Sequence, residues 1–404
     1  MSKYKEDKKK VALLVVLLSG LMVIAYSSIG IYTPAMPAIG DFFDISSAKV
    51  QLTFSVYILS FAFGQLFYGP FSDKHGRRPA IFIGLFIYIL GSIVAFLSSS
   101  IEILILARAL QGFGGCSGPV VGRAILRDLF DRERGAIVLS YISMVMGAAP
   151  AFAPIIGGYL QVNFNWQSIF LFLIIIGLIV FLSNFIYLKE SNIDRDQKKN
   201  IPPNFFGPIN SYLPFISSPV FMVYSLTASF AMSMVFVYSA GTPFILISLL
   251  GISPDTYGWY ILIPTFTNFL GAYVTARLIP FFGVEKLIFI GALVVMLGGL
   301  LMAFLSIIYS LAVFIIILPM CIIMFGLSVL YPSAAQGAIS VFPKIAGAAS
   351  SLNGFMHMFI ASAMVFLSAN FFNATQWPVI LIILINGVLT FLSLVLFIIF
   401  KKRR

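Results

Sequence analysis

Five residues in one short segment combine opposite charges with two glycines. The segment GPFSDKHGRRP begins at Gly69, places Asp73 four residues before Arg77, and follows that arginine with Arg78. An acid and a base at this spacing pair across a helical turn. Gly69 and Gly76 permit close packing and a sharp turn. A solvated basic loop explains the two arginines but not this ordered combination, so the segment predicts an ion-paired corner.

A second charge stands inside an apolar run. Arg108 lies about one and a half turns into the apolar run 102–126, which contains LILARALQG, with Gln111 next on the same helical face. A charge at membrane depth costs about 2.5–3.5 kcal/mol and usually faces a partner or an aqueous cavity. Glu102 lies at the start of this run, and His357 lies within a later predicted span. These two residues are the titratable candidates for proton coupling. For His357, a proton carrier and a packed, hydrogen-bonded side chain are both open interpretations.

A third pattern is made of small residues and prolines. In MGAAPAFAPIIGGYL, Gly147, Pro150, Pro154, Gly157 and Gly158 recur at spacings close to one helical turn. Faces without bulky side chains favour close contact between helices, and the prolines bend the axis. Plain small-residue packing is the alternative interpretation of this stripe.

The composition places all three patterns in a membrane. Of 404 residues, 60% are hydrophobic and only 10% are charged, whereas soluble domains carry roughly a quarter of charged residues. The formal charge of +11 is spread over short clusters between apolar runs, which argues against a nucleic-acid partner. Cys116 and Cys321 fall inside apolar runs and form no metal-binding pattern, so we expect neither a metal nor a cofactor. With two histidines and no acid deep in a predicted helix, an enzyme is not expected.

The apolar runs predict twelve transmembrane helices, each about as long as a hydrocarbon core of about 30 Å requires. They are residues 11–36, 48–71, 79–99, 102–126, 136–160, 168–188, 219–247, 257–280, 287–307, 311–340, 345–369 and 377–400. The predicted fold class is therefore all-α and integral to the membrane. A six-helix bundle over 1–188, a cytoplasmic linker over 189–218 and a second bundle over 219–404 make up the chain. A weak internal repeat, GAYVTARLIPFFGVEK in the place of GPFSDKHGRRP, relates the two bundles.

The basic residues fix the predicted orientation. With a cytoplasmic N-terminus, 23 of the 25 Lys and Arg residues fall on the inner side, as the positive-inside rule requires. Both termini are then cytoplasmic. The first apolar run is longer than the core of a signal peptide and ends in TPAMP, so we interpret it as an uncleaved first helix.

These motifs together resemble those of the major facilitator superfamily over the whole chain. By that resemblance, the segment from Gly69 to Arg78 is a conformational latch between helices two and three, whose charge pairs form and break. The run around Arg108 resembles the helix-four motif that lies near the proton pathway of the family. The glycine and proline stripe of helix five resembles the antiporter motif of exporters. The resemblance implies transport by alternating access in the outward direction.

The end of helix one resembles a narrower group, the Bcr/CflA-type drug-resistance branch of the drug:H+ antiporters with twelve helices. In SSIGIYTPAMPAI, the residues Tyr32, Pro34 and Pro37 match that branch. Gly30 stands where the branch has an aspartate, which is a candidate proton carrier there. Proton coupling in this chain must therefore use another group.

The sequence thus predicts a secondary active exporter of drugs or amphipathic small metabolites in a bacterial inner membrane. The expected partners are a small organic substrate, protons and the lipid bilayer, and the expected state is a monomer. A dedicated exporter of one metabolite or siderophore, without proton coupling, is the alternative within this class, and a non-transporting receptor is the alternative outside it. The candidate substrate-binding residues have polar tips and lie in spans that line the cavity of the family: Tyr26, Tyr32, Tyr57, Gln65, Tyr224, Tyr238, Asn268, Gln336 and Asn353.

Overall fold

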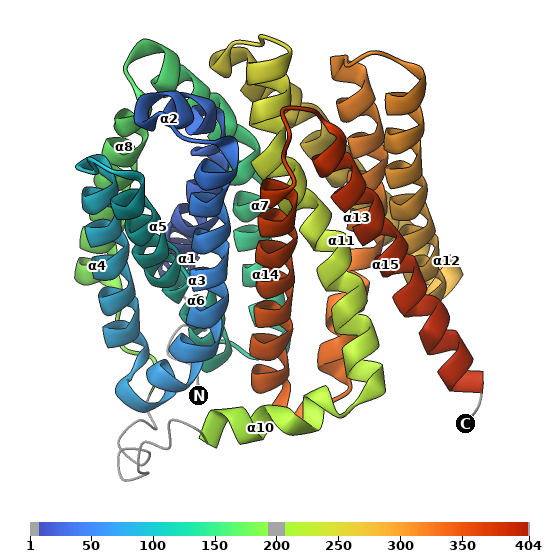
Figure 1. Ribbon diagram of the computed structural model, residues 1–404. Helices are drawn as coiled ribbons and strands as arrows, with labels where there is room; N and C mark the ends of the chain where they lie inside the picture. Colours follow the sequence, from blue (N-terminus) through green and yellow to red (C-terminus); the bar gives the residue numbers. More distant parts are fainter. Residues whose placement is uncertain (1–7, 193–206, 403–404) are drawn as a thin grey trace. The chain divides into compact units, whose positions relative to one another are not determined.

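The computed structural model describes residues 8–192 and 207–402, and this part of the chain folds into helices without a β-strand (Figure 1). The prediction of an all-α fold is confirmed. The chain divides into two compact units. Unit 1 comprises residues 1–32 and 56–208, and unit 2 comprises residues 33–55 and 209–404. The predicted division at 189–218 stays a prediction.

Unit 1 is a bundle of long apolar helices. They are α1 (Lys8–Gly30), the larger part of α3 (Ser47–His75), α4 (Arg77–Phe96), α5 (Ile101–Gly115), α6 (Ser117–Leu129), α7 (Arg132–Asn163) and α8 (Trp166–Tyr187). Polar caps mark several starts: the side chains of Ser100, Asp131 and Asn165 each accept a backbone N–H from the first turn of α5, α7 and α8.

Unit 2 contains the remaining elements. They are the 3-10 turn η1 (Thr33–Ala35), α2 (Met36–Phe43), the start of α3, α10 (Gly207–Ile216), α11 (Pro219–Pro243), the π-helix η2 (Phe244–Leu249), α12 (Pro254–Ile308), α13 (Val313–Ser340), η3 (Pro343–Ile345), α14 (Ala346–Asn370) and α15 (Trp377–Lys402).

Ten helices within the described residues are long and apolar enough to cross a membrane. One of them, α12, joins two helices across a break at Gly283, where φ is 72°. In addition, α5 and α6 follow one another with only Cys116 between them and together have the length of a span. If α12 counts as two spans and α5 with α6 as one, the number is consistent with the twelve that the sequence predicts.

Two predicted helix ends are wrong for a physical reason. The second span continues to His75 rather than ending at 71, because a helix can pass from lipid into a polar environment without breaking. The first span ends at Gly30 rather than 36, because the proline-containing stretch after it forms η1 and then the separate helix α2.

Glycines set the spacing of the helix pair that carries Arg108. A Cβ atom at Gly91 of α4 would lie 2.7 Å from the backbone nitrogen of Gln111, and one at Gly84 would lie 2.9 Å from the carbonyl oxygen of Gly114. A Cβ at Gly112 would lie 2.2 Å from the carbonyl oxygen of Tyr57 in α3. Backbone of α5 therefore lies directly against α4 and α3.

Candidate functional site

Arg108 is completely buried in unit 1 and is held between two aromatic rings. Its guanidinium carbon lies 4.5 Å from the ring centroid of Tyr32 and 4.2 Å from that of Tyr57. The close approach of Gly112 to the backbone of Tyr57 places Arg108, one turn earlier on α5, beside that ring. Tyr32 and Tyr57 are both predicted substrate-binding residues, and the structure brings them together on the predicted intramembrane charge.

The hydrogen bonds of Arg108 lead into a chain of neutral groups. Its Nη1 donates to the side-chain oxygen of Gln111 at 2.5 Å, and Nη1 and Nη2 each lie 3.4 Å from the carbonyl oxygen of Ser28. The amide nitrogen of Gln111 donates to Ser92 at 2.8 Å, and Ser92 donates to the carbonyl of Tyr88. Gln111, which shares a helical face with Arg108, is therefore its direct hydrogen-bond partner.

Tyr88 and Ser28 belong to this network although the sequence patterns did not indicate them. The Ser28 hydroxyl donates to the carbonyl of Ile24 at 2.7 Å, so the Tyr88 hydroxyl, 2.6 Å from Ser28, is the donor in that pair. Tyr57 donates to the carbonyl of Ala25 at 2.7 Å. Isolated Ser and Tyr residues in apolar spans carry no distinctive spacing, so no signal in the sequence marks them.

Cation–π contacts are what compensate this buried charge. Such a contact contributes about 2 kcal/mol or more when it is desolvated, which is comparable with the cost of about 2.5–3.5 kcal/mol for a charge at membrane depth. Two rings and an amide oxygen can therefore hold Arg108 charged without a carboxylate. The arrangement suits binding and charge recognition.

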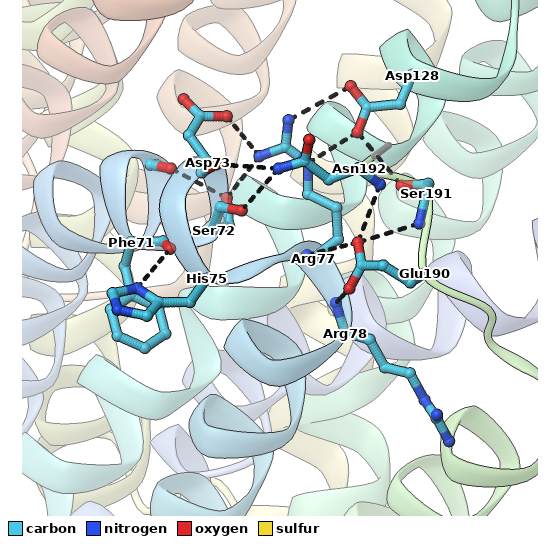
Figure 2. A network of polar contacts seen from close by, with 11 residues as sticks. Phe71, Ser72, Asp73, His75, Arg77, Arg78, Asp128, Glu190, Ser191 and Asn192 are labelled. Atoms are coloured by element: carbon cyan, nitrogen blue, oxygen red, sulfur yellow. Dashed lines mark hydrogen bonds and ion pairs between the residues drawn. The ribbon is translucent and has the colours of Figure 1, made fainter. Parts of the chain in front are cut away.

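The predicted latch forms a network at the corner between α3 and α4 (Figure 2). Arg77 is 4% exposed, and its guanidinium pairs with Asp73 at 2.5 Å and with Asp128 of α6 at 2.8 Å. It also donates to the Ser72 hydroxyl at 2.9 Å. The expected pairing of Asp73 with Arg77 is observed, and Asp128 is an additional partner that the sequence reasoning missed.

Arg78 has a different environment from Arg77. It donates to the carbonyl of Phe185 at 2.7 Å, and its guanidinium lies 5.3 Å and 5.4 Å from the ring centroids of Phe82 and Phe185. Gly69 accepts a hydrogen bond from Ser72 on its carbonyl oxygen. Arg78 therefore attaches α4 to the end of α8, while Arg77 joins α3 and α6.

Glu190 is the main residue of this corner that the sequence reasoning missed. Its carboxylate accepts backbone N–H groups of Arg77 (2.9 Å), Arg78 (3.0 Å), Ser191 (3.1 Å) and Asn192 (2.9 Å) (Figure 2). Partial burial alone raises the pKa of the Glu190 carboxyl, but these four donors outweigh it and hold that pKa below its ordinary value. An acid two residues after the last apolar residue of the sixth run was the available signal.

Gly76 is the point at which this carboxylate reaches the backbone. Its φ of 104° lies in the region that favours glycine, and a Cβ there would lie 2.6 Å from Oε2 of Glu190. The chain therefore turns sharply at the single residue Gly76, as predicted. Glu190 accepts hydrogen bonds from the N–H groups at the start of α4, which have no partner within the helix.

The helix-five stripe meets α1 in unit 1. Pro154, Gly157 and Gly158 are buried on α7, and a Cβ at Gly157 would lie 2.0 Å from the carbonyl oxygen of Ile31. Gly147 lies half-buried on the same helix, and Pro150 is also part of α7. Close packing at Gly157 agrees with the small-residue pattern, and its role in antiport stays a prediction.

The two titratable candidates belong to different units. Glu102 is exposed in the first turn of α5, six residues before Arg108. His357 is buried on α14 of unit 2, where its Nδ1 lies 3.2 Å from the Tyr331 hydroxyl. Each acid in the described residues is exposed or half-buried.

The other substrate-binding candidates are distributed over both units. In unit 1, Tyr26 is half-buried with its ring 5.8 Å from that of Phe61, and Gln65 is buried. In unit 2, Tyr238 and Asn353 are buried, Tyr224 is half-buried and Gln336 is exposed. The side-chain nitrogen of Asn268 donates to the carbonyl of Met324 at 3.1 Å.

Comparisons with known proteins agree with this architecture. The family model described as Major Facilitator Superfamily matches residues 18–366. The chain is similar to Multidrug resistance protein D of Escherichia coli K12, with 29% identity over 91% of this chain and 93% of the relative. It is also similar to a bicyclomycin resistance protein homologue of Haemophilus influenzae, with 26% identity over 93% of both chains.

A solved structure has the same fold. It is a bacterial homologue of the human lysosomal transporter Spinster in an inward-facing, unoccupied conformation, with a TM-score of 0.67 and 15% identity over 97% of this chain and 96% of that one. The helical architecture, the corner motif and these matches confirm the predictions of a membrane transporter rather than an enzyme. The chain belongs to the Major Facilitator Superfamily.

Proposed function

We propose that this protein is a secondary active exporter of drugs or amphipathic small metabolites that works by alternating access. The observation that carries the proposal is the buried Arg108 between Tyr32 and Tyr57, at membrane depth in a chain of this family. Multidrug and bicyclomycin resistance proteins among the relatives support drug efflux. The helix-five stripe supports the outward direction, and coupling to protons is part of the proposal.

The ion-paired corner between α3 and α4 also has a role in the proposed mechanism. Arg77 joins α3 to α6 through Asp73 and Asp128, and Glu190 joins the same corner to the chain beyond α8. A corner held by several charge-assisted bonds is stable but can rearrange when one partner moves. We propose that its pairs break and re-form during the transport cycle.

Transport in a defined system tests the proposal. The purified chain is reconstituted in proteoliposomes, and the flux of a panel of dyes is measured with and without an imposed pH gradient. We expect protein-dependent flux of several dyes that increases with the gradient. Binding without flux would contradict the exporter, and flux that ignores the pH gradient would contradict proton antiport.

The orientation is part of the proposal and has its own test. We propose an inner-membrane location with both termini cytoplasmic. Asp255 and Lys286 are both exposed in the structure. A membrane-impermeant maleimide added to intact cells should label Asp255→Cys and should leave Lys286→Cys unlabelled. The reverse pattern would contradict the proposed orientation.

A further inference from the structure

We propose that Arg108 binds the anionic group of the transported molecule, so that the preferred cargo is an organic anion with an aromatic or aliphatic body. This inference rests on the proposed export function and specifies its substrate class. The groups that contact the guanidinium are all neutral: the rings of Tyr32 and Tyr57, the amide of Gln111 and the carbonyl of Ser28. A buried cation ordinarily has a carboxylate as its partner. Here the cargo supplies that negative charge.

One edge of the guanidinium has unused hydrogen-bonding capacity. Nε of Arg108 is buried and finds no acceptor in the described part of the chain. The adjacent Nη2 makes one long contact of 3.4 Å with the Ser28 carbonyl. Nε and Nη2 together form the fork that grips carboxylate, sulfonate or phosphate oxygens in a bidentate pair. An oxyanion would satisfy the donor that the protein leaves unpaired.

The chain contains an internal comparison that separates this role from packing. In unit 2, Gly298 approaches the nitrogen of Ile323 and the carbonyl of Pro319, just as Gly91 approaches the nitrogen of Gln111 and the carbonyl of Ala107 in unit 1. At the same sequence offset, Arg108 corresponds to the buried Met320. A neutral, apolar residue therefore serves the same helix contact, and the charge of Arg108 is not needed to build it.

The surroundings of Arg108 suit the body of an amphipathic anion. Tyr57 stacks on Phe61 at 6.4 Å, Phe61 lies 5.8 Å from Tyr26, and Tyr32 lies 5.9 Å from Phe170. Aromatic rings thus extend from both sides of the charge within unit 1. In the structure the rings of Tyr32 and Tyr57 cover Arg108, so binding requires one of them to move. Tyr32 lies in the turn between α1 and η1.

An anionic cargo also suits a unit in which no described acid is fully buried. Each acid in the described part of unit 1 is exposed or half-buried. A bacterial inner membrane is negative inside, so an anion that leaves the cell moves down the electrical gradient. Export of an anion can therefore proceed without a protonating carboxylate in this unit.

Three probes of matched shape test the inference on the full chain in proteoliposomes. They are naphthalenesulfonate, its neutral sulfonamide, and naphthylmethylammonium. We expect the wild type to bind and transport the sulfonate in preference to the ammonium by about tenfold or more, and an inside-negative potassium diffusion potential to speed sulfonate efflux. Arg108→Gln should lower sulfonate affinity by about tenfold and sulfonamide affinity by no more than about threefold, while Arg108→Lys should keep part of the preference.

The outcomes distinguish this inference from the proposed function. Equal or tighter binding of the ammonium by the wild type, or an equal loss of all three probes in Arg108→Gln, would overturn the anion site. If Arg108→Gln fails to fold, the ranking of the probes on the wild type decides. Flux of the sulfonamide or of dyes without flux of the sulfonate would support the export function and contradict the preference for an anionic cargo. If no compound is transported, the export function fails, and the binding ranking still tests Arg108.

Discussion

The helix pair α4–α5 of unit 1 and the pair formed by the second part of α12 with α13 in unit 2 are built alike. Gly84 meets the carbonyl of Gly114 in the first pair, and Gly291 meets the carbonyl of Gly326 in the second, both at 2.9 Å from the position of a Cβ. The two pairs differ in what they carry. The first buries a charge, and the second buries Met320 in its place. The packing of the two helix pairs is thus shared, whereas the buried charge is present only in the first pair.

Exchanging these two residues should have the largest effect. Arg108→Met should strongly reduce transport of the naphthalenesulfonate with little loss of thermal stability, because a methionine already occupies the matching position in unit 2. Met320→Arg should destabilise the protein by about 2.5–3.5 kcal/mol, because it buries a charge without a ring cage. Flux in proteoliposomes and unfolding in detergent measure the two effects. Unchanged sulfonate transport in Arg108→Met would show that the buried charge does not distinguish the two helix pairs functionally.

Alanine at matched glycines should reveal how rigid each pair is. A Cβ at Gly114 would lie 2.4 Å from the backbone nitrogen of Tyr88, whereas one at Gly326 would lie 2.9 Å from side-chain carbons of Val294 and Val295 and 3.0 Å from the carbonyl oxygen of Gly291. Backbone cannot move aside as a side chain can. Gly114→Ala should therefore cost more than Gly326→Ala, within the usual range of about 1–3 kcal/mol for overpacking. Equal melting temperatures for the two variants would show that the pairs relax alike.

The two corners offer a smaller contrast. Gly76 and Gly283 have φ values of 104° and 72°, so alanine is strained at both, by about 1–3 kcal/mol. Only at Gly76 would the added Cβ also meet Glu190; at Gly283 the space within 4 Å is open. Gly76→Ala should be the more destabilising change in a thermal unfolding assay. Transport should fall only in Gly76→Ala, and a loss in both variants would mean that both corners act in the cycle.

The smallest expected effect is a change in the response to acid. The lowered pKa of Glu190 means that its carboxylate stabilises the folded corner fully above its ordinary pKa of 4.5. That contribution disappears as the pH falls through the lowered pKa, because the proton removes an acceptor of the backbone N–H groups. Glu190→Gln should therefore be less stable than wild type at pH 7, and the gap should narrow at acidic pH. A constant gap would contradict the charge-based role.

The sequence predicted the fold well because lipid imposes simple demands. Long apolar runs and the placement of basic residues suffice to indicate spanning helices, and α4, α8 and α15 lie close to the predicted ranges. Boundaries were wrong where polar residues continue a helix, as at His75, or where proline breaks an apolar run, as at Pro34. Hydropathy reports the medium around a residue and not whether its backbone remains helical.

The candidate site was predictable in part for the same reason. A single arginine in an apolar run, such as Arg108, is conspicuous. The four-residue spacing of Asp73 and Arg77 predicts that they pair. The partners contributed by other helices were not predictable. Glu190 and Asp128 come from segments far along the chain, and tertiary packing brings them to Arg77. Tyr32 and Tyr57 could be named as aromatic candidates, but their contacts with Arg108 follow from tertiary packing, which for Tyr57 is the close contact at Gly112.

The membership of residues 33–55 in unit 2 has a consequence for the order in which the chain is made. Ser55 and Ser362 exchange hydrogen bonds between their hydroxyls and each other's carbonyl oxygens at 2.9 Å, across 307 residues of sequence. During synthesis the early segment must enter the membrane long before α14 exists. At about 5–20 residues per second, that wait lasts roughly 15–60 seconds. Throughout it, the Ser55 hydroxyl has to use other partners, because its native partner lies on α14, the second-to-last helix of the chain.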